Sequence, residues 1–246
     1  LEQQLADCLK TLLQQVPDLA PPCDDLETLE LDISDARDIL EEPLHAPPLL
    51  DVVFIDELRG VAVGAFNTIL RTSDGGLHWE SIAASLDNPD EYHLNAITGS
   101  ADGRLWIAAE GGLLFRSDDA GASWQALESP YYGSFFGIAR ASTGDTLLAF
   151  GLRGNLFRSD DGGDSWQQVD TGSERSLAGG AFVVTSYVVL VGAVGTLLVS
   201  ADGGMTFSAH NWGGRQGLSA VASSGNATVV VGQGGVHPVS PFGGAQ

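Results

Sequence analysis

The chain has 246 residues, of which 32 are Asp or Glu and 11 are Lys or Arg, so its formal net charge is −21. This acidity argues against nucleic-acid binding, because contact with phosphates requires a basic surface, and it also disfavours docking on anionic lipid. No apolar run approaches the length of about 18 residues that a membrane-spanning helix needs, so direct insertion into lipid is not expected.

Composition divides the chain into an acidic N-terminal segment and a glycine-rich remainder. Residues 1–50 contain no glycine and carry 12 acidic residues against two basic ones, whereas all 32 glycines lie from Gly60 onward. Prolines cluster at the boundary, at Pro43, Pro47 and Pro48. We therefore predict an acidic helical or extended segment over residues 1–49 and a separate domain over residues 50–246.

The N-terminal segment combines a helical pattern with a short alternating one. Apolar side chains recur at three- and four-residue spacing through residues 1–16, which predicts an amphipathic helix that ends at Pro17. Alternation of apolar and acidic residues predicts a short strand over residues 28–33. Ser34 is placed to cap a second helix that reaches about residue 42.

Both cysteines, Cys8 and Cys23, lie in this segment and would close a loop of about 15 residues if paired. We predict this disulfide; the alternative is two reduced thiols in a helical segment, and two cysteines alone lack the four ligands of a zinc site. The chain begins at Leu1 rather than Met. We interpret it as a processed form, either a periplasmic or otherwise exported protein after removal of a signal peptide, or a trimmed chain.

From residue 50 onward one eight-residue phrase occurs four times. Each copy follows the pattern Ser/Thr-x-Asp-x-Gly-x-polar-aromatic, and the closing aromatic residues lie 45, 42 and 41 residues apart. A fixed period of about 40–50 residues indicates an array of supersecondary units. The four copies are Thr72–Trp79, Ser117–Trp124, Ser159–Trp166 and Ser200–Phe207.

The second copy shows what one unit contains. Strands are predicted at residues 92–99, 105–109, 113–117 and 124–127, separated by turns that contain Gly and Asp. Four short antiparallel strands in a period of this length are typical of a β-propeller blade.

A fifth copy starts at Leu218 but lacks the Asp turn and the fourth strand. We therefore predict an all-β chain, a β-propeller of about five four-stranded antiparallel blades with a short N-terminal helical appendage. Two interpretations of the last blade stay open. The predicted strand at residues 28–33 completes it, or the chain is cut short from a ring with more blades, because an open blade exposes unpaired edges.

The repeated phrase has a structural interpretation. Its Asp accepts hydrogen bonds from nearby backbone N–H groups and locks a turn, the Gly two residues later takes a positive φ, and the aromatic residue fills the space between neighbouring blades. A calcium loop is the rival interpretation at residues 160–164, but the full ligand pattern is absent, so we predict no metal and no cofactor. The structural residues are Asp74, Gly76, Trp79, Asp119, Gly121, Trp124, Asp161, Gly163, Trp166, Asp202, Gly204 and Phe207.

The residues before each phrase extend the pattern to Gly-x-x-Gly-x-[Ile/Leu]-[Phe/Leu]-Arg-Ser-x-Asp-Gly-Gly-x-x-Trp, which is clearest at residues 151–166. These phrases resemble Asp-box repeats, also called bacterial neuraminidase repeats. Over about residues 50–240 the chain is most similar to the photosystem II stability/assembly factor family. Members of that family usually form seven blades, so the length of this chain departs from their pattern.

The resemblance implies an exported, non-catalytic propeller that binds proteins. We expect a scaffold, an assembly factor or an accessory subunit of a membrane protein complex, an envelope transporter among them. The alternative is a glycan-binding or glycoside-hydrolysing propeller, because sialidases also carry Asp boxes. The Arg-Ile-Pro motif that opens the sialidase arginine set does not occur in this sequence, and neither do common hydrolase motifs, so we assign no catalytic residue.

Three arginines, Arg71, Arg116 and Arg158, recur at one register before three of the phrases. One interpretation is a salt bridge or a packing contact within the blades, and the other is a basic patch that binds a partner. Four further arginines on predicted turns or blade ends are equally plausible contributors to such a patch, namely Arg104, Arg140, Arg153 and Arg175.

Tyr131 and Tyr132 belong to the densest aromatic cluster, residues 131–136, which links the second blade to the third. A loop there would face one rim of the propeller, where partners bind, or its rings would fill the core between blades. The acidic segment over residues 1–49 likewise has two interpretations, a structural element that completes the propeller or an arm that grasps a partner.

Overall fold

The computed structural model of the protein describes residues 47–184, 186–210, 214–224 and 227–239. Contacts divide the chain into two compact units, Leu1–Ala46 and Pro47–Gln246. The predicted helices at residues 1–16 and 34–42, the predicted strand at residues 28–33 and the predicted Cys8–Cys23 disulfide lie outside the described residues.

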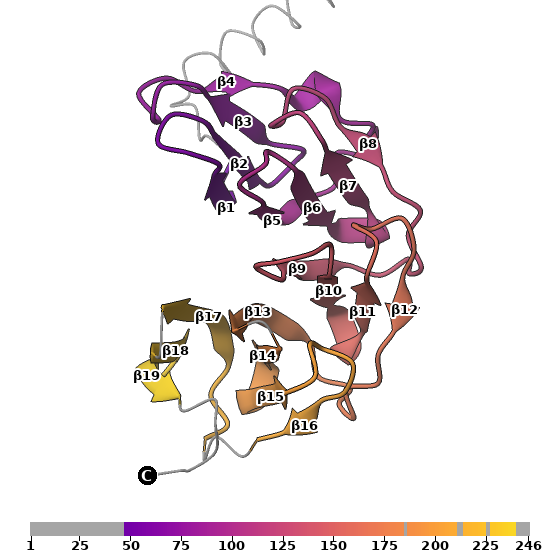
Figure 1. Cartoon of the computed structure of the whole chain (residues 1–246), viewed down its shortest axis with the longest axis vertical. Helices are drawn as coiled ribbons and strands as arrows, with labels where there is room; N and C mark the ends of the chain where they lie inside the picture. The colour runs from indigo at the N-terminus through magenta and orange to yellow at the C-terminus, as the bar shows by residue number, and fades with distance from the viewer. Residues whose placement is uncertain (1–46, 185, 211–213, 225–226, 240–246) are drawn as a thin grey trace, which may run out of the picture. The chain divides into compact units, whose positions relative to one another are not determined.

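Five antiparallel sheets follow one another along the described chain, from indigo to yellow in Figure 1. The predicted β-propeller of five blades is therefore confirmed. Blades 1 to 4 have four strands each, and three strands are described in blade 5. The strands of blades 1 and 2 are β1 (Leu49–Phe54), β2 (Gly60–Gly64), β3 (Ile69–Thr72), β4 (Glu80–Ser81), β5 (Leu94–Gly99), β6 (Leu105–Ala109), β7 (Leu114–Ser117) and β8 (Gln125–Ala126).

The later blades repeat this order. In blade 2 the predicted strand limits and those of the structure agree within two residues. The strands of blades 3 to 5 are β9 (Phe135–Arg140), β10 (Leu147–Gly151), β11 (Leu156–Ser159), β12 (Gln167–Gln168), β13 (Leu177–Val184), β14 (Tyr187–Gly192), β15 (Thr196–Ser200), β16 (Ser208–Ala209), β17 (Leu218–Ser224), β18 (Ala227–Gly232) and β19 (Gly235–Val239). Short 3-10 turns are η2 (Ala83–Ser85), η3 (Glu110–Gly112), η4 (Leu152–Gly154) and η5 (Ala193–Gly195).

In blades 1, 2 and 3 the second strand is buried along its whole length. Its sequence accordingly shows a continuous apolar run, Leu-Trp-Ile-Ala-Ala in β6, instead of an alternation of apolar and polar residues. In blades 2 and 3 the two faces of this strand pack against the preceding and the following blade, so each face requires apolar residues.

Four apolar clusters form the core, and each one joins two successive blades. The first combines Val61 and Ile69 of blade 1 with Leu94, Leu105 and Phe115 of blade 2. The other three join blades 2 and 3, blades 3 and 4, and blades 4 and 5 in the same way. Since the apolar area is buried between sheets, the stability of each blade depends on its neighbours.

Backbone hydrogen bonds sort the loops into two rims. On one rim the turn between the third and fourth strands donates to the turn between the first and second strands, as in Gly162 N to Asp145 O at 3.0 Å. On the other rim the turn between the second and third strands donates to the linker that enters the same blade, as in Leu152 N to Ser134 O at 3.0 Å. We call these the box rim and the linker rim.

Glycines hold the linkers close to the turns on the linker rim. A Cβ placed on Gly154 would lie 1.9 Å from Ser173 O, and one on Gly112 would lie 1.9 Å from Tyr131 O. Both glycines also have a positive φ, 73° and 79°. Only a residue without a side chain fits there, because the obstructing atom is a backbone oxygen that cannot rotate away.

Gly154 and Gly144 provide a test of this close approach, since their φ values are 73° and 74° but nothing lies within 4 Å of a Cβ on Gly144. We expect Gly144→Ala to lower the free energy of unfolding by about 1 kcal/mol, the cost of the left-handed conformation. Gly154→Ala should cost about 1–3 kcal/mol more through steric overlap. Urea titrations of both variants measure the difference, and equal losses would contradict the proposed steric role of Gly154.

Candidate functional site

The repeated phrase forms the same turn in all four copies, which we call the box turn. In blade 3 the Ser159 hydroxyl donates to Asp161 Oδ1 at 2.8 Å and accepts from Gly163 N at 2.8 Å. Asp161 also accepts from the backbone N–H of Ser165 at 2.9 Å and from its hydroxyl at 2.6 Å. Asp119 with Ser123, Asp202 with Thr206, and Asp74 with the backbone and ring of His78 make the corresponding bonds.

These hydrogen bonds lower the pKa of the box-turn carboxylates. The Ser165 hydroxyl lowers the pKa of Asp161 to about 2, and the Thr206 hydroxyl lowers the pKa of Asp202 to about 2. For Asp74 the backbone N–H of His78 has the largest effect and the pKa is again about 2. The pKa of Asp119 is lowered as well, chiefly by the Ser123 hydroxyl. Each carboxylate is therefore ionised and engaged within its own turn.

The glycine of the box turn lies against the preceding blade. A Cβ on Gly121 would lie 2.9 Å from Val61 Cγ2 in blade 1, and one on Gly204 would lie 2.9 Å from a Leu148 methyl in blade 3. Gly76, in blade 1, has no neighbour nearer than 3.6 Å, the Nε1 atom of Trp79. The glycine thus has two requirements in the later blades, a positive φ and room for the preceding sheet.

The closing aromatic residues also differ between blade 1 and the later blades. Trp124, Trp166 and Phe207 pack against the clusters that join blades 1 and 2, 2 and 3, and 3 and 4. Trp79 in blade 1 is 37% exposed and stacks edge-on against Phe54, with ring centroids 6.1 Å apart. Three of the four aromatics therefore lie between blades.

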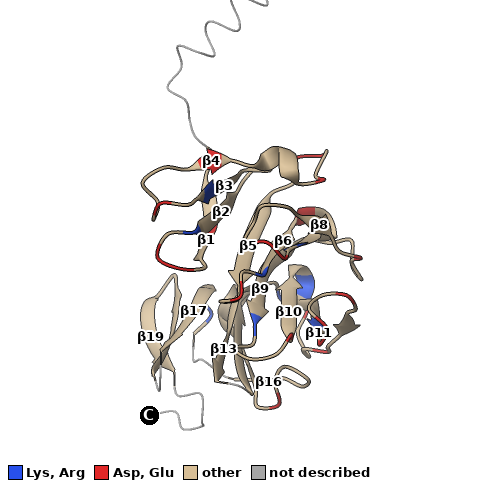
Figure 2. Ribbon diagram, turned by 45° about the horizontal axis from the view of Figure 1, so that its top comes forward, with Lys and Arg blue, Asp and Glu red and all other residues tan. Residues whose placement is uncertain are grey.

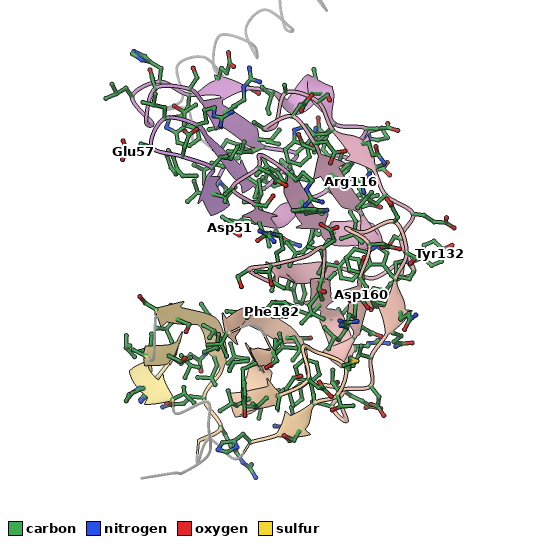
Figure 3. The ribbon with its side chains drawn as sticks, viewed as in Figure 1. Asp51, Glu57, Arg116, Tyr132, Asp160 and Phe182 are labelled. Atoms are coloured by element: carbon green, nitrogen blue, oxygen red, sulfur yellow. The ribbon has the colours of Figure 1, made fainter. Side chains whose placement is uncertain are left out.

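Arg116 and Arg158 reach from one blade to the box turn of the next. Arg116 Nη1 lies 2.7 Å from Asp164 Oδ1 and donates to Gly162 O at 3.2 Å, and the indole of Trp106 donates to the same carbonyl at 2.8 Å. Arg158 Nε donates to Gly203 O at 3.2 Å. Figure 3 labels Arg116 at the side of the sheets where blades 2 and 3 meet.

Arg71, at the same register in blade 1, makes no such connection in the described residues. Its guanidinium pairs with Glu80 of its own blade, with Nη2 and Oε1 2.6 Å apart. The next box turn after Arg71 is that of blade 2, where Ala120, at a φ of 60°, stands in the place of Gly162. The structure therefore brings none of the three register arginines together into one patch; each contacts a different turn or strand.

The two tyrosines of the linker between blades 2 and 3 have different surroundings. Tyr131 packs on the cluster between these blades, and its ring lies 5.5 Å from that of Phe157. Its hydroxyl accepts from Asn155 Nδ2 at 3.2 Å. Tyr132 is 93% exposed and is labelled at the outer side of the molecule in Figure 3.

The arginines divide between the two rims by their partners. In the described residues, all arginine–carboxylate ion pairs belong to the box rim or to the third strands leading to it, and they involve Arg59, Arg71, Arg104, Arg116 and Arg158. Arg153, Arg175 and Arg215 lie on the linker rim, and no carboxylate within the described part of the chain pairs with them. Figure 2 shows acidic residues, in red, mainly in the turns at the strand ends.

A hollow of the described surface lies on the linker rim at blade 4. It has a volume of about 740 Å³ and is lined by Arg175, His210 and Arg215 together with a single acidic residue, Glu174. Arg175 is one of seven arginines that the sequence offers for a partner-binding patch, whereas Arg215 is not among them, because it belongs neither to the repeated phrase nor to a predicted blade end. The signal that the sequence did contain is the presence of two arginines in linkers of a chain with a net charge of −21.

No helix in the described ranges is long and apolar enough to cross a membrane. Among the same residues, no group of three or more His, Cys, Asp or Glu side chains is placed to hold a metal ion.

Comparison with known proteins identifies relatives by sequence and solved structures with a similar fold. A family profile described as "Photosynthesis system II assembly factor YCF48" matches residues 35–167. The photosystem II assembly lipoprotein Ycf48 of Synechococcus sp. (strain CC9902) is 43% identical over 79 residues, which are 32% of this chain and 23% of that relative. The chain therefore aligns with only about a quarter of the length of this curated relative.

Solved structures share the fold at low sequence identity. YCF48 from Cyanidioschyzon merolae matches with a TM-score of 0.65 and 19% identity, over 82% of this chain and 70% of that one. The GH74 xyloglucanase of Xanthomonas campestris matches with a TM-score of 0.61 and 15% identity, over 76% of this chain and 36% of that one. Since the fold is shared by an assembly factor and a glycosidase, it does not by itself distinguish between them.

The box-turn carboxylates predict a defined loss of stability in acid. A folded-state pKa near 2, below the unfolded value of about 3.9, contributes stability above about pH 4 that is lost as the pH falls towards 2. Asp161→Asn should be less stable than the wild type at pH 6 and should lose less stability between pH 4 and pH 2. Urea titrations at several pH values measure this, with Glu57→Gln, at an exposed carboxylate, as the control. Parallel curves for the wild type and Asp161→Asn would exclude this role.

The arginine contacts predict a difference between equivalent positions. Arg116→Met removes the contacts with Asp164 and Gly162 of the next blade, and we expect the free energy of unfolding to fall by about 1–2 kcal/mol. Arg71→Met removes only a contact with the exposed Glu80 and should cost about 0–1 kcal/mol. Chemical denaturation of both variants compares them; a larger loss for Arg71→Met would mean that the contact between blades 2 and 3 is not the important one.

Proposed function

The chain belongs to the photosynthesis system II assembly factor YCF48 family, and from this membership we propose that it is a non-catalytic propeller that assists the assembly of a membrane protein complex. The observation that carries the proposal is the family match over residues 35–167, which extends from before blade 1 into the last strand of blade 3. The named relative is described as an assembly lipoprotein of photosystem II. We propose a membrane-complex subunit as the partner of this chain too.

The contacts of the repeated residues support binding over catalysis. The carboxylates and hydroxyls of the box turns bond to one another and to backbone N–H groups, so the motif that glycosidases share with this chain acts here as a turn. Arg116 and Arg158 bond to box-turn carbonyls of the next blade. We propose that the box-turn residues and the register arginines, Arg71 included, are structural and that partners approach the linker rim.

The linker rim has the properties of a protein-binding surface. Large apolar side chains are exposed in its loops, among them Phe66 at 62% and Tyr132 at 93%. The same rim carries arginines that have no carboxylate partner in the described part of the chain. Aromatic residues and arginines are the side chains that protein interfaces favour over the remaining surface.

We propose an exported location, the periplasm or an equivalent compartment, because the relative is a lipoprotein. A membrane subunit in the course of assembly exposes its loops and tails to such a compartment. Residues 1–49 are in this proposal an acidic appendage, either a structural part of the propeller or an arm that contacts the same partner.

A deletion strain of the source organism tests the function. We expect native gels of its membranes to show less of one fully assembled complex and an accumulation of unassembled subunits, with recovery when the full chain is supplied. The tagged full chain should retain one of those unassembled subunits in mild detergent, and a chain without residues 1–45 would show whether the appendage is needed.

Two outcomes would overturn the proposal. One is unchanged assembly of every membrane complex in the deletion strain. The other is hydrolysis of xyloglucan or of a sialylated glycan by the purified chain, which would assign it to the glycosidases that share its fold.

A further inference from the structure

One position recurs in each of the four linkers between blades. Its backbone carbonyl accepts a hydrogen bond from the turn between the second and third strands of the blade that the linker enters. His93 O accepts in this way from Glu110 N at 3.0 Å, and Ser176 O from Ala193 N at 2.9 Å. The residues at this position are His93, Ser134, Ser176 and Gly217.

Two of these side chains bond to the preceding blade, at the tip of the hairpin between its second and third strands. Ser176 Oγ accepts from the backbone N–H of Arg153 at 3.2 Å, and His93 Nδ1 accepts from that of Phe66 at 3.3 Å. Phe66 and Arg153 occupy matching places in their tips, with φ values of 51° and 57°. The same bond is thus made once by a hydroxyl and once by an imidazole, and of these two groups only the imidazole titrates near neutral pH.

The Nδ1 atom of His93 faces a donor and an acceptor at once. It accepts from Phe66 N only while it carries no proton, which is the tautomer with the hydrogen on Nε2. Glu110 Oε2 lies 3.5 Å from the same nitrogen, and an ion pair with this carboxylate requires a proton on Nδ1. Glu110 is held in place, because its Oε2 also accepts from the backbone N–H of His93 at 3.1 Å. The ring therefore satisfies only one of the two neighbours in each protonation state.

Glu110 is the charged group that competes for this nitrogen. The tip over residues 65–68 has no ionisable side chain, and the linker contributes Asp90, Glu91 and Tyr92 just before His93. Within the described part of the chain, Glu110 is the one carboxylate that lies within ion-pair distance of the His93 ring. The residues that match Glu110 in blades 3 and 4 are Leu152 and Ala193, so the carboxylate accompanies the histidine and is absent beside the serines.

The tip that His93 holds exposes an aromatic ring. Phe66 is 62% exposed, and its ring stands edge-on to that of His93, with centroids 4.7 Å apart. A bulky residue at a positive φ is unfavourable and persists only where the surrounding contacts hold it. Asn67 also bonds to the linker, from its N–H to Tyr92 O at 3.3 Å. Loss of the bond to His93 would therefore loosen Phe66 without detaching the whole tip.

We propose that His93 is a pH-sensitive switch for the tip of blade 1. Neutral His93 accepts from Phe66 N and holds the exposed ring in one position. His93 that has taken up a proton from the solvent donates from Nδ1 to Glu110, and the N–H of Phe66 turns to water. This inference goes beyond the proposed function, since the switch requires neither a partner nor a complex.

Nuclear magnetic resonance of the ¹⁵N-labelled full chain between about pH 5 and pH 8 follows both groups. We expect the neutral His93 ring to carry its hydrogen on Nε2, and the amide signal of Phe66 to shift with the same midpoint as the ring. Protection of the Phe66 amide against hydrogen exchange should fall by about threefold or more when the ring is protonated. The Arg153 amide, which is bonded to Ser176, is the internal control and should not follow this midpoint.

Three variants separate the groups involved. His93→Ser introduces the residue that the chain uses at Ser176, so the tip should stay bonded and the Phe66 amide should lose its pH dependence. Glu110→Gln keeps an acceptor for the His93 N–H but removes the charge, so the midpoint should move to lower pH by about 0.5 unit or more. His78→Ser removes the exposed histidine of the blade 1 box turn and is the matched control, which should leave the response of Phe66 unchanged. Circular dichroism and thermal melts verify that each variant is folded.

Five results would each contradict the inference. In the wild type these are a neutral ring with its hydrogen on Nδ1, a Phe66 amide that does not change as His93 titrates, and an equal change at Arg153. In the variants they are a pH dependence that persists in His93→Ser and an unmoved midpoint in Glu110→Gln. The wild-type results decide the question even if a variant does not fold. None of them bears on the proposed function, which the deletion strain tests independently.

Discussion

The contact between the box turns of blades 2, 3 and 4 and the blade that precedes each of them is the constraint on which the rest of the molecule depends. The Asp161 carboxylate accepts hydrogen bonds from the hydroxyls and a backbone N–H group of its own turn, and these bonds fix the conformation of the turn. That shape presents the carbonyl of Gly162 to Trp106 and Arg116 of blade 2. The indole N–H is buried, so the carbonyl that satisfies it also fixes the distance between the two sheets.

Blade 1 shows what happens to the same motif when no blade precedes it in the described chain. Trp79 is 37% exposed, and Gly76 has no side chain of a preceding sheet near it. Along β1, Val52 and Phe54 are 53% and 46% exposed. The side chain of Val53 points to the other face of the sheet and packs on the cluster shared with blade 2. The internal hydrogen bonds of the box turn persist there, since the contacts of Asp74 are local. The hydrogen bonds of the box turn therefore form without a preceding blade, whereas the packing of its glycine and aromatic residue requires one.

The two rims differ because their charges are used differently. On the box rim, arginines and carboxylates of neighbouring turns satisfy one another, as Arg104 does with Asp102 and Asp145. On the linker rim, Arg175 bonds to a carbonyl and has no carboxylate partner among the described residues. A surface whose charges are already paired gains little from a charged partner, whereas unpaired guanidinium groups retain most of their interaction energy for one. This asymmetry supports the proposal that partners bind on the rim opposite the box turns.

The sequence by itself determined the repeat, its period and the limits of the strands, because Gly/Asp turns and apolar runs are local signals. It also determined the family, since the phrase at residues 151–166 is specific enough to resemble one group of propellers. Only the tertiary structure decided which side chains are engaged. Tyr131 and Tyr132 are neighbours in sequence, yet one packs between blades and the other is 93% exposed. Arg71 and Arg116 share a register, but only Arg116 finds a box-turn carbonyl in the next blade. Such differences arise from contacts between residues about 40 positions apart, and a local pattern carries no information about what the neighbouring blade presents.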